Sequence, residues 1–446
     1  MVTLGRFKTG LLVAAMLMLN ACSTSSLFTS YPSQIKPIKA QIENGDFTKA
    51  EKKLSGKTDS TDKILYLMEQ GRVSQLAGNY ETSQKEYGKA IDAIRAHDDK
   101  ALYTVSGGAA QANAVLINDN AIPYYGSPYE ITLLHQYQAL NFAALGDLEG
   151  ALVEVRRASA EQKTQKVSHE SELNTAKKSK ANVNDVLSDQ HFAKMRKEAA
   201  TLQSSFQNAY TFYFSGLLYE AAGLKNDASI DYKKALALAP NNEYIQHNLN
   251  RVDGTTSKDP AKGQIVVIFE EGFIPAKEEF SIPLPTGAGL IKVTLPFYKD
   301  KKQNTAPLSI TLNNNPIGKT QTLSNIQALA SKTLSDNLTG IVAREVARQV
   351  TRIAAEHSAK NKDNIALVFA TNLYAIITAN ADLRSWLTLP HEVQVLSIDA
   401  LPGSQPLTVN YKGNSANNTV DISSGKTTLV IVQSMNNHLI SHVYNL

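Results

Sequence analysis

The residue types that most often perform chemistry occur here without the spacing that known reactions require. The Gly-Lys-Thr triplets at 318–320 and 425–427 end like a phosphate-binding loop, but neither has a glycine five residues earlier, where that loop begins. Both lie between apolar runs typical of strands, so we interpret them as hairpin turns. His438 and His442 are spaced like two metal ligands on a helix, yet their segment alternates like a strand. We therefore predict no catalytic centre, no metal site and no cofactor.

Three arginines form the sharpest charge pattern. Arg344, Arg348 and Arg352 recur every four residues in a helix expected over 323–359, so they share one face. This face is either a solvated surface or a basic ridge that contacts anionic lipid headgroups or an acidic partner.

The only cysteine, Cys22, follows an apolar run at 11–19 after Asn20 and Ala21, and the run is preceded by Arg6 and Lys8. The run is long enough for a signal peptide and too short to span a bilayer. It resembles the lipobox of bacterial lipoproteins. The resemblance implies a signal peptide over 1–21, acylation of Cys22 and, because Ser23 follows, a location on the outer membrane facing the periplasm. The alternative is an ordinary secretory signal with a coincidental cysteine.

Composition excludes several other classes of protein. The chain has 446 residues, of which 43% are hydrophobic, and 45 basic against 41 acidic side chains. It is therefore neither disordered nor charged enough to bind nucleic acid by bulk electrostatics. A single cysteine also excludes a disulfide within the chain.

After a short tether expected over 22–37, recurrent spacings predict a helical repeat domain over 38–254. A small residue is followed by a glycine after seven residues, then by an aromatic residue and an alanine after 16 and 19 residues. This pattern resembles tetratricopeptide repeats, in which the small residue admits the aromatic ring of the second helix and the glycine ends the first. A generic helical bundle is the alternative. The predicted packing residues are Gly71, Gly78, Tyr80, Tyr87, Ala90, Gly146, Ala151, Ala158, Gly216, Tyr219, Gly223, Ala228, Tyr232, Ala235 and Pro240.

In such a repeat array the first helix of each pair lines a concave groove. That register places polar or amphipathic side chains toward the groove, where they could bind a peptide or a protein. The candidate groove residues are Arg72, Gln75, Gln136, Tyr213 and Glu220.

A change of pattern after a linker at 255–263 predicts a second domain over 264–446. Short apolar or alternating runs predict strands, and two helices are expected near 323–359 and 364–381. The fold class is a helical repeat domain followed by a β-sandwich-like domain with two inserted helices. The only tryptophan, Trp386, fits a core position better than a ligand platform. The expected strands cover 264–269, 280–285, 289–298, 308–312, 317–322, 393–398, 407–411, 419–422, 428–433 and 440–444.

Three stretches, at 130–158, 264–298 and 381–390, are similar to an uncharacterised family of Gram-negative lipoproteins with tetratricopeptide-like repeats and a β-rich C-terminal domain. The resemblance implies an architecture and a location, but no activity.

Together these patterns favour a lipid-anchored scaffold or adaptor that binds an unidentified envelope protein or peptide in its repeat groove, and no nucleic acid. Cell-envelope assembly is the natural setting for such a protein. The alternative is an enzyme or ligand-binding module formed by residues 264–446.

Overall fold

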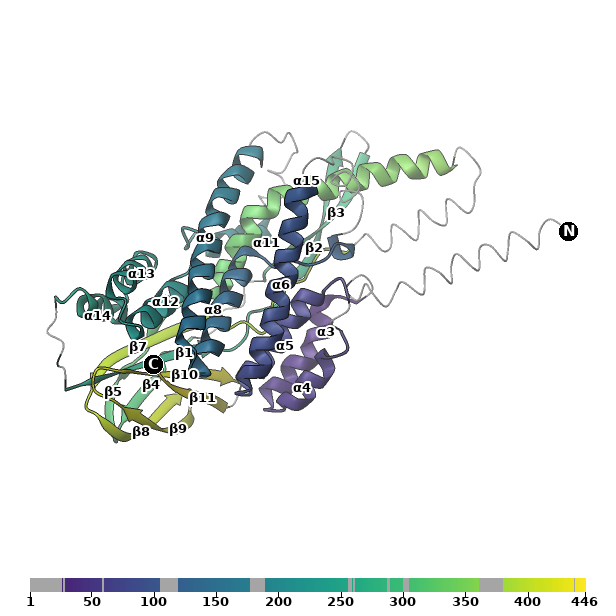
Figure 1. Cartoon of the computed structure of the whole chain (residues 1–446). Coiled ribbons are helices and arrows are strands. Elements are labelled where there is room, and N and C mark those ends of the chain that lie inside the picture. The colour runs from purple at the N-terminus through teal and green to yellow at the C-terminus, as the bar shows by residue number, and fades with distance from the viewer. Residues whose placement is uncertain are drawn as a thin grey trace.

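The computed structural model describes residues 29–57, 60–104, 119–176, 189–255, 261–286, 289–299, 305–360, 380–436 and 438–446, together with Ser26 and Asp259. Within them the chain is a mixed α and β protein (Figure 1). The predicted signal peptide, Cys22 and residues 361–379, which include most of the helix expected over 364–381, lie outside the described residues.

The N-terminal half consists of successive helix pairs, as the repeat spacing predicts. The two helices of each pair pack against each other. Neighbouring pairs are joined by contacts of α4 with α5, of α6 with α8 and of α9 with α12, which align the pairs in an array. The pairs are α3 (Tyr31–Glu43) with α4 (Phe47–Leu54), α5 (Lys63–Leu76) with α6 (Tyr80–Thr104), α8 (Pro128–Ala144) with α9 (Leu148–Ala176), and α12 (Ala209–Ala221) with α13 (Lys225–Leu238), followed by α14 (Glu243–Val252).

The first helix begins within the expected tether. Tyr31 and Ile35 of α3 are completely buried, and Pro32 occupies the first turn, where its missing N–H costs nothing. The tether predicted over 22–37 is therefore wrong from Tyr31 onward. Apolar residues at helical spacing continue the core into this segment.

Glycine and tyrosine pack between paired helices as predicted. A Cβ atom at Gly216 would lie 2.6 Å from the ring of Tyr232, so only glycine admits this ring. Gly71 stands in the same relation to Tyr87. Gly78 and Gly223, which follow α5 and α12, have φ of +79° and +77°, the left-handed conformation that ends a helix.

The C-terminal half contains two sheets packed face to face. The first has five strands in the order β11-β10-β1-β7-β6, and the second has four in the order β5-β4-β8-β9. Between them, apolar side chains such as Val267, Leu396 and Val409 form one core. The strands are β1 (Gly263–Glu271), β4 (Ser309–Leu312), β5 (Asn315–Lys319), β6 (Gln321–Asn325), β7 (Glu392–Ala400), β8 (Gly403–Tyr411), β9 (Asn414–Ile422), β10 (Thr427–Met435) and β11 (His438–Asn445).

The outer face of the five-stranded sheet packs on the helix pairs. Val266, Ile268 and Ile431 belong to the same apolar core as the residues of α5, α8 and α12. The protein therefore has three layers, with helices above the five-stranded sheet and the four-stranded sheet below it (Figure 1). The two predicted domains share this core.

A smaller unit extends beyond the sheets. The hairpin of β2 (Glu278–Thr286) and β3 (Gly289–Phe297) packs on α15 (Ile326–Lys360), which also packs on α11 (Gln190–Ala199). The strand expected over 317–322 is in fact two strands, β5 and β6. Because β6 continues to Asn325, α15 begins three residues later than predicted. Among the described helices, none combines the length and the apolar character needed to cross a membrane.

Candidate functional site

The concave side of the helix pairs is covered by the five-stranded sheet. Arg72, Gln75, Gln136 and Tyr213 are all buried, and the Glu220 side chain is only 11% exposed. These positions contradict our expectation of an open groove. The physical reason is that β1 and β10 are apolar on both faces, so one face must be covered by the helices.

Glu270 of β1 lies where the sheet meets α5, α8 and α12, the first helices of three pairs. Arg72 of α5 forms an ion pair with this carboxylate. The hydroxyls of Tyr137 of α8 and Tyr210 of α12 both donate to its Oε1 at 2.9 Å. Gln433 of β10 donates to Oε2 at 3.3 Å. A buried carboxylate needs such partners, and this cluster therefore joins the sheet to three helices.

The segment that precedes β7 enters the same concave side. Trp386 is completely buried, with its ring centroid 5.8 Å from that of Tyr87 and 5.9 Å from that of Tyr137. Its backbone N–H donates to Glu130 of α8 at 2.7 Å. The prediction that Trp386 occupies a core position is confirmed.

Glu69 of α5 binds the main chain of the next two residues. Its carboxylate accepts hydrogen bonds from the N–H of Leu387 at 2.7 Å and of Thr388 at 3.2 Å. Burial raises the pKa of the Glu69 carboxyl to about 7, although the bonds from Thr388, Leu387 and Tyr31 oppose this effect. Carboxylates of the first helices thus hold a segment of the same chain, which turns at Leu387 and Thr388, in the place where an open repeat groove would hold a separate peptide.

Three other predicted groove residues form polar contacts inside the protein. Gln75 donates to Asn141 of α8 at 2.7 Å. Gln136 accepts a bond from Thr211 of α12. Glu220 forms an ion pair with Arg251 of α14 at 2.7 Å. These contacts connect neighbouring helices.

The arginines of the predicted basic ridge also have partners within the protein. Arg348 is 8% exposed and forms ion pairs with Asp119 and Glu345. Arg344 is half-exposed and lies 3.6 Å from Asp119, and Arg352 also has an interaction partner. The two arginines that face Asp119 join α15 to the turn at η2 (Asp119–Ala121). The expectation of an exposed ridge is wrong for Arg348.

The remaining motif residues occupy turns and strands. Gly425 has φ of +73° in the turn between β9 and β10, so the second triplet lies in a turn, although these two strands belong to different sheets and form no hairpin. Gly318 and Lys319 lie within β5, so the hairpin turn predicted at 318–320 is wrong. The turn of the β4–β5 hairpin lies instead at Asn313 and Asn314, which have φ of +49° and +62°. His438 and His442 lie on β11, and the ring of His442 is 3.2 Å from the carbonyl oxygen of Leu76. Within the described ranges, no group of three or more His, Cys, Asp or Glu side chains is placed to hold a metal ion.

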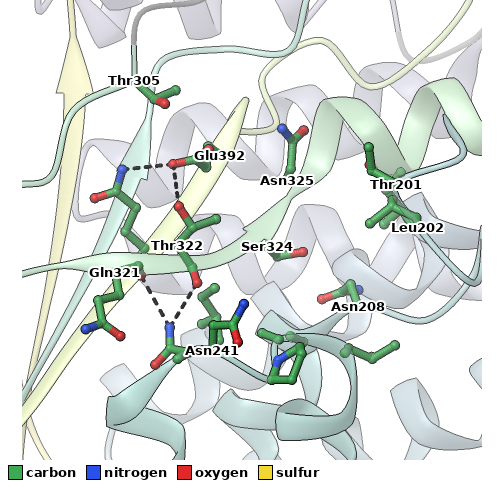
Figure 2. Close-up of a pocket in the computed structure, with 18 of the residues that line it drawn as sticks. Thr201, Leu202, Asn208, Asn241, Thr305, Gln321, Thr322, Ser324, Asn325 and Glu392 are labelled. Carbon is green, nitrogen blue, oxygen red and sulfur yellow. Dashed lines mark hydrogen bonds between the residues drawn. The ribbon is translucent and has the colours of Figure 1, made fainter. Parts of the chain in front are cut away.

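A cavity of about 800 Å³ lies along β6, the edge strand of the five-stranded sheet (Figure 2). We call it the β6 cavity. It is bounded by β6, the segments 201–204 and 305–307, the start of α12 and the turn between α13 and α14. Its size is within the range of small-ligand sites. The polar side chains of its lining are Thr201, Gln203, Ser204, Gln207, Asn208, Asn241, Asn242, Thr305, Thr320, Gln321, Thr322, Ser324, Asn325, Glu392 and Gln394.

Side-chain amides approach the open edge of β6. Asn242 Nδ2 donates to the carbonyl oxygen of Thr322 at 2.9 Å, so this carbonyl points away from β7 (Figure 2). Asn208 is 3% exposed; its Oδ1 caps α12 at the N–H of Thr211. Asn208 Nδ2 is buried and has no hydrogen-bond partner. An unsatisfied buried donor costs free energy that a ligand oxygen could recover.

Glu392 is the one charged residue among the described lining residues of the β6 cavity. It is buried and accepts hydrogen bonds from Thr322 at 3.2 Å and Gln394 at 2.9 Å. Burial raises the pKa of this carboxyl above its usual value, and the neighbouring Glu271 raises it further. The described part of the lining contains no Lys, Arg or His.

Sequence reasoning missed Glu69, Glu270, Asn208 and Glu392. Glu270 had a detectable signal, because it follows the apolar run 265–269 near the end of a buried strand, where a carboxylate needs a buried partner. Glu392 likewise begins a buried strand. Asn208 and Glu69 carried no comparable signal, because an N-cap asparagine and a single helical glutamate are common in any helix.

Comparisons with known proteins add little. No family model matches the chain, and no curated protein matches it. The chain is similar to a solved tetratricopeptide repeat protein from Parabacteroides merdae ATCC 43184, with 15% identity over 50% of this chain and 99% of that chain. The TM-score is 0.14.

Proposed function

We propose that this protein is a lipid-anchored binding protein of the bacterial cell envelope, held on the outer membrane and facing the periplasm, and that its partner binds at the β6 cavity. The β6 cavity carries the proposal. It combines an edge strand, a row of amides and the unpartnered donor Asn208 Nδ2. The position of Cys22 after its apolar run supports the anchor.

The helix pairs have a different role in this proposal. Their concave side already holds β1 and the segment around Trp386, so no partner can enter it while the fold is intact. The helices therefore act as a rigid frame that positions the sheet edge. A binding site at the sheet edge, held by this helical frame, replaces the hypothesis of a scaffold with an open groove.

The β6 cavity favours binding over catalysis. General acid and base catalysis uses titratable groups positioned around one reacting atom. The described lining offers a single carboxyl, Glu392, and no histidine, lysine or cysteine beside it. An enzyme within residues 264–446 is thus the weaker candidate.

Photo-crosslinking in intact cells tests this function. Ala237 is exposed on α13 and lines the β6 cavity, whereas Ile230 on the same helix is 52% exposed and does not line it. With a photoreactive residue in the full chain, we expect a discrete crosslinked species from position 237 and none from 230. Identical crosslinks from both positions, or none from either, would refute the proposal.

A further inference from the structure

The edge of β6 restricts what can occupy the β6 cavity. In the described sheet β6 pairs with β7 on one side and with no strand on the other. An edge strand presents main-chain groups that can pair with an added strand. The carbonyl of Thr322 is such a group, and the side-chain amide of Asn242 already donates to it as a neighbouring strand would.

The opposite wall of the β6 cavity can also bind a main chain. Asn208 Nδ2 is a buried donor without a partner, and Gln203 and Gln207 line the cavity beside it. Side-chain amides provide both donors and acceptors, which match the alternating N–H and C=O groups of a peptide. Small residues, Ala237 and Ala239, leave room for the side chains of that peptide.

Charge and ring content decide between ligand classes. The carboxyl of Glu392 is not matched by a cation among the described lining residues, so it favours a basic side chain over an acidic one. The same lining contains no Phe, Tyr, Trp or His, which would provide a flat face for a sugar ring. Both observations favour a peptide over an anionic or carbohydrate ligand.

We infer that the β6 cavity binds an extended peptide segment that carries a basic side chain. The main chain of this segment lies along the outer edge of β6, and its basic side chain faces Glu392. This inference rests on the proposed function and names the class of its partner. Main-chain hydrogen bonds supply affinity in this type of recognition, and the alternate side chains supply selectivity.

Binding of blocked peptide pools to the detergent-solubilised full chain tests the inference. One pool has random centres flanked by lysines, and the other has the same centres flanked by glutamates. We expect the lysine pool to bind at least about tenfold more tightly, which corresponds to about 1.4 kcal/mol. N-methylation of every peptide bond in the centre should abolish binding, because it removes the main-chain donors on both edges of the extended peptide.

Matched variants locate the binding site. Ala237→Trp should fill the β6 cavity and abolish binding, whereas Ile230→Trp should leave it unchanged. Glu392→Gln keeps the acceptor oxygen for Gln394 and should remove the preference for lysine while the peptides still bind. Circular dichroism of each variant checks that the fold is retained.

Three results would overturn the inference. They are binding that is insensitive to Ala237→Trp, equal binding of N-methylated peptides, and failure of both pools to bind. Binding of an N-acetylglucosamine oligomer that Ala237→Trp abolishes would overturn it in favour of a glycan. In that case the crosslink from position 237 would persist, so the proposed function would survive.

Discussion

Arg72 of α5 and Glu270 of β1 form a buried ion pair across 198 residues of sequence. The two side chains are 2% and 1% exposed, and Tyr137 and Tyr210 donate hydrogen bonds to the same carboxylate. The pair therefore links the first helices of three repeats to the central strand of the sheet.

Removal of one partner of this pair should strongly destabilise the protein. Arg72→Ala leaves the Glu270 carboxylate buried without its counter-ion, which typically costs about 3–5 kcal/mol. Denaturant unfolding measures the change. The exposed pair of Lys49 with Asp46 is the control, and Lys49→Ala should have little effect.

The double variant Arg72→Met/Glu270→Met removes both charges. We expect it to be more stable than Arg72→Ala, because no unpaired charge remains. If Arg72→Ala destabilises the protein no more than Lys49→Ala does, the ion pair does not hold the sheet on the helices.

Glu69 should make stability depend on pH. Its pKa is about 7 in the folded protein, against an ordinary value of 4.5, so the folded state binds the proton more tightly than the unfolded state. Stability should therefore fall as pH rises from about 4.5 to about 7, by up to about 3 kcal/mol. Urea unfolding of the parent and of Glu69→Gln across this interval gives the difference.

The substitution Glu69→Gln should flatten this part of the pH profile, because the amide does not titrate. Glu81→Gln, at an exposed position of α6, should leave the profile unchanged. Parallel profiles for the parent and Glu69→Gln would show that another group is responsible.

Overpacking should destabilise the last repeat. Gly216→Leu places side-chain atoms against the ring of Tyr232 and should cost about 1–3 kcal/mol. Thermal unfolding measures this. Gly56→Leu is the control, because a Cβ at Gly56 meets nothing within 4 Å. Equal melting temperatures for the two variants would disprove the packing role of Gly216.

The lipid anchor predicted at Cys22 can be tested by fractionation. Acylation requires the thiol, so Cys22→Ser should release the protein from membranes or leave it as an uncleaved precursor. A mutant that keeps both mature size and membrane attachment would rule the anchor out. Asn20→Ser, which changes a neighbouring residue but keeps the thiol, should remain attached.

Local elements were predictable because they depend on neighbouring residues. The spacing of Gly216 and Tyr232 identified a helix pair, and the alternation within 407–411 identified a strand. Individual boundaries were predicted wrongly where tertiary packing extended an element, as at Tyr31, where α3 begins inside the expected tether.

The closed groove could not be predicted from such patterns. Arg72 was placed correctly on the inner side of the first helices, but polar side chains on that side suit an external peptide and an internal strand equally well. The choice depends on contacts between residues far apart in sequence, such as Glu69 with Leu387. The β6 cavity was missed for the same reason, because its walls come from five separate segments.

The pairing of β1 has a consequence for the order of folding. Its parallel neighbour is β10, so Gln264 meets Thr427 only when nearly the whole chain has been synthesised. Until then the core between the sheet and the helices lacks Leu429 and Ile431 of β10, and apolar surface left incomplete in this way promotes aggregation and attracts chaperones. The sequence separation of these contacts also slows folding. A chain cut before residue 427 would lack this part of the core, so proteases could distinguish incomplete molecules from complete ones by the apolar surface that β10 covers.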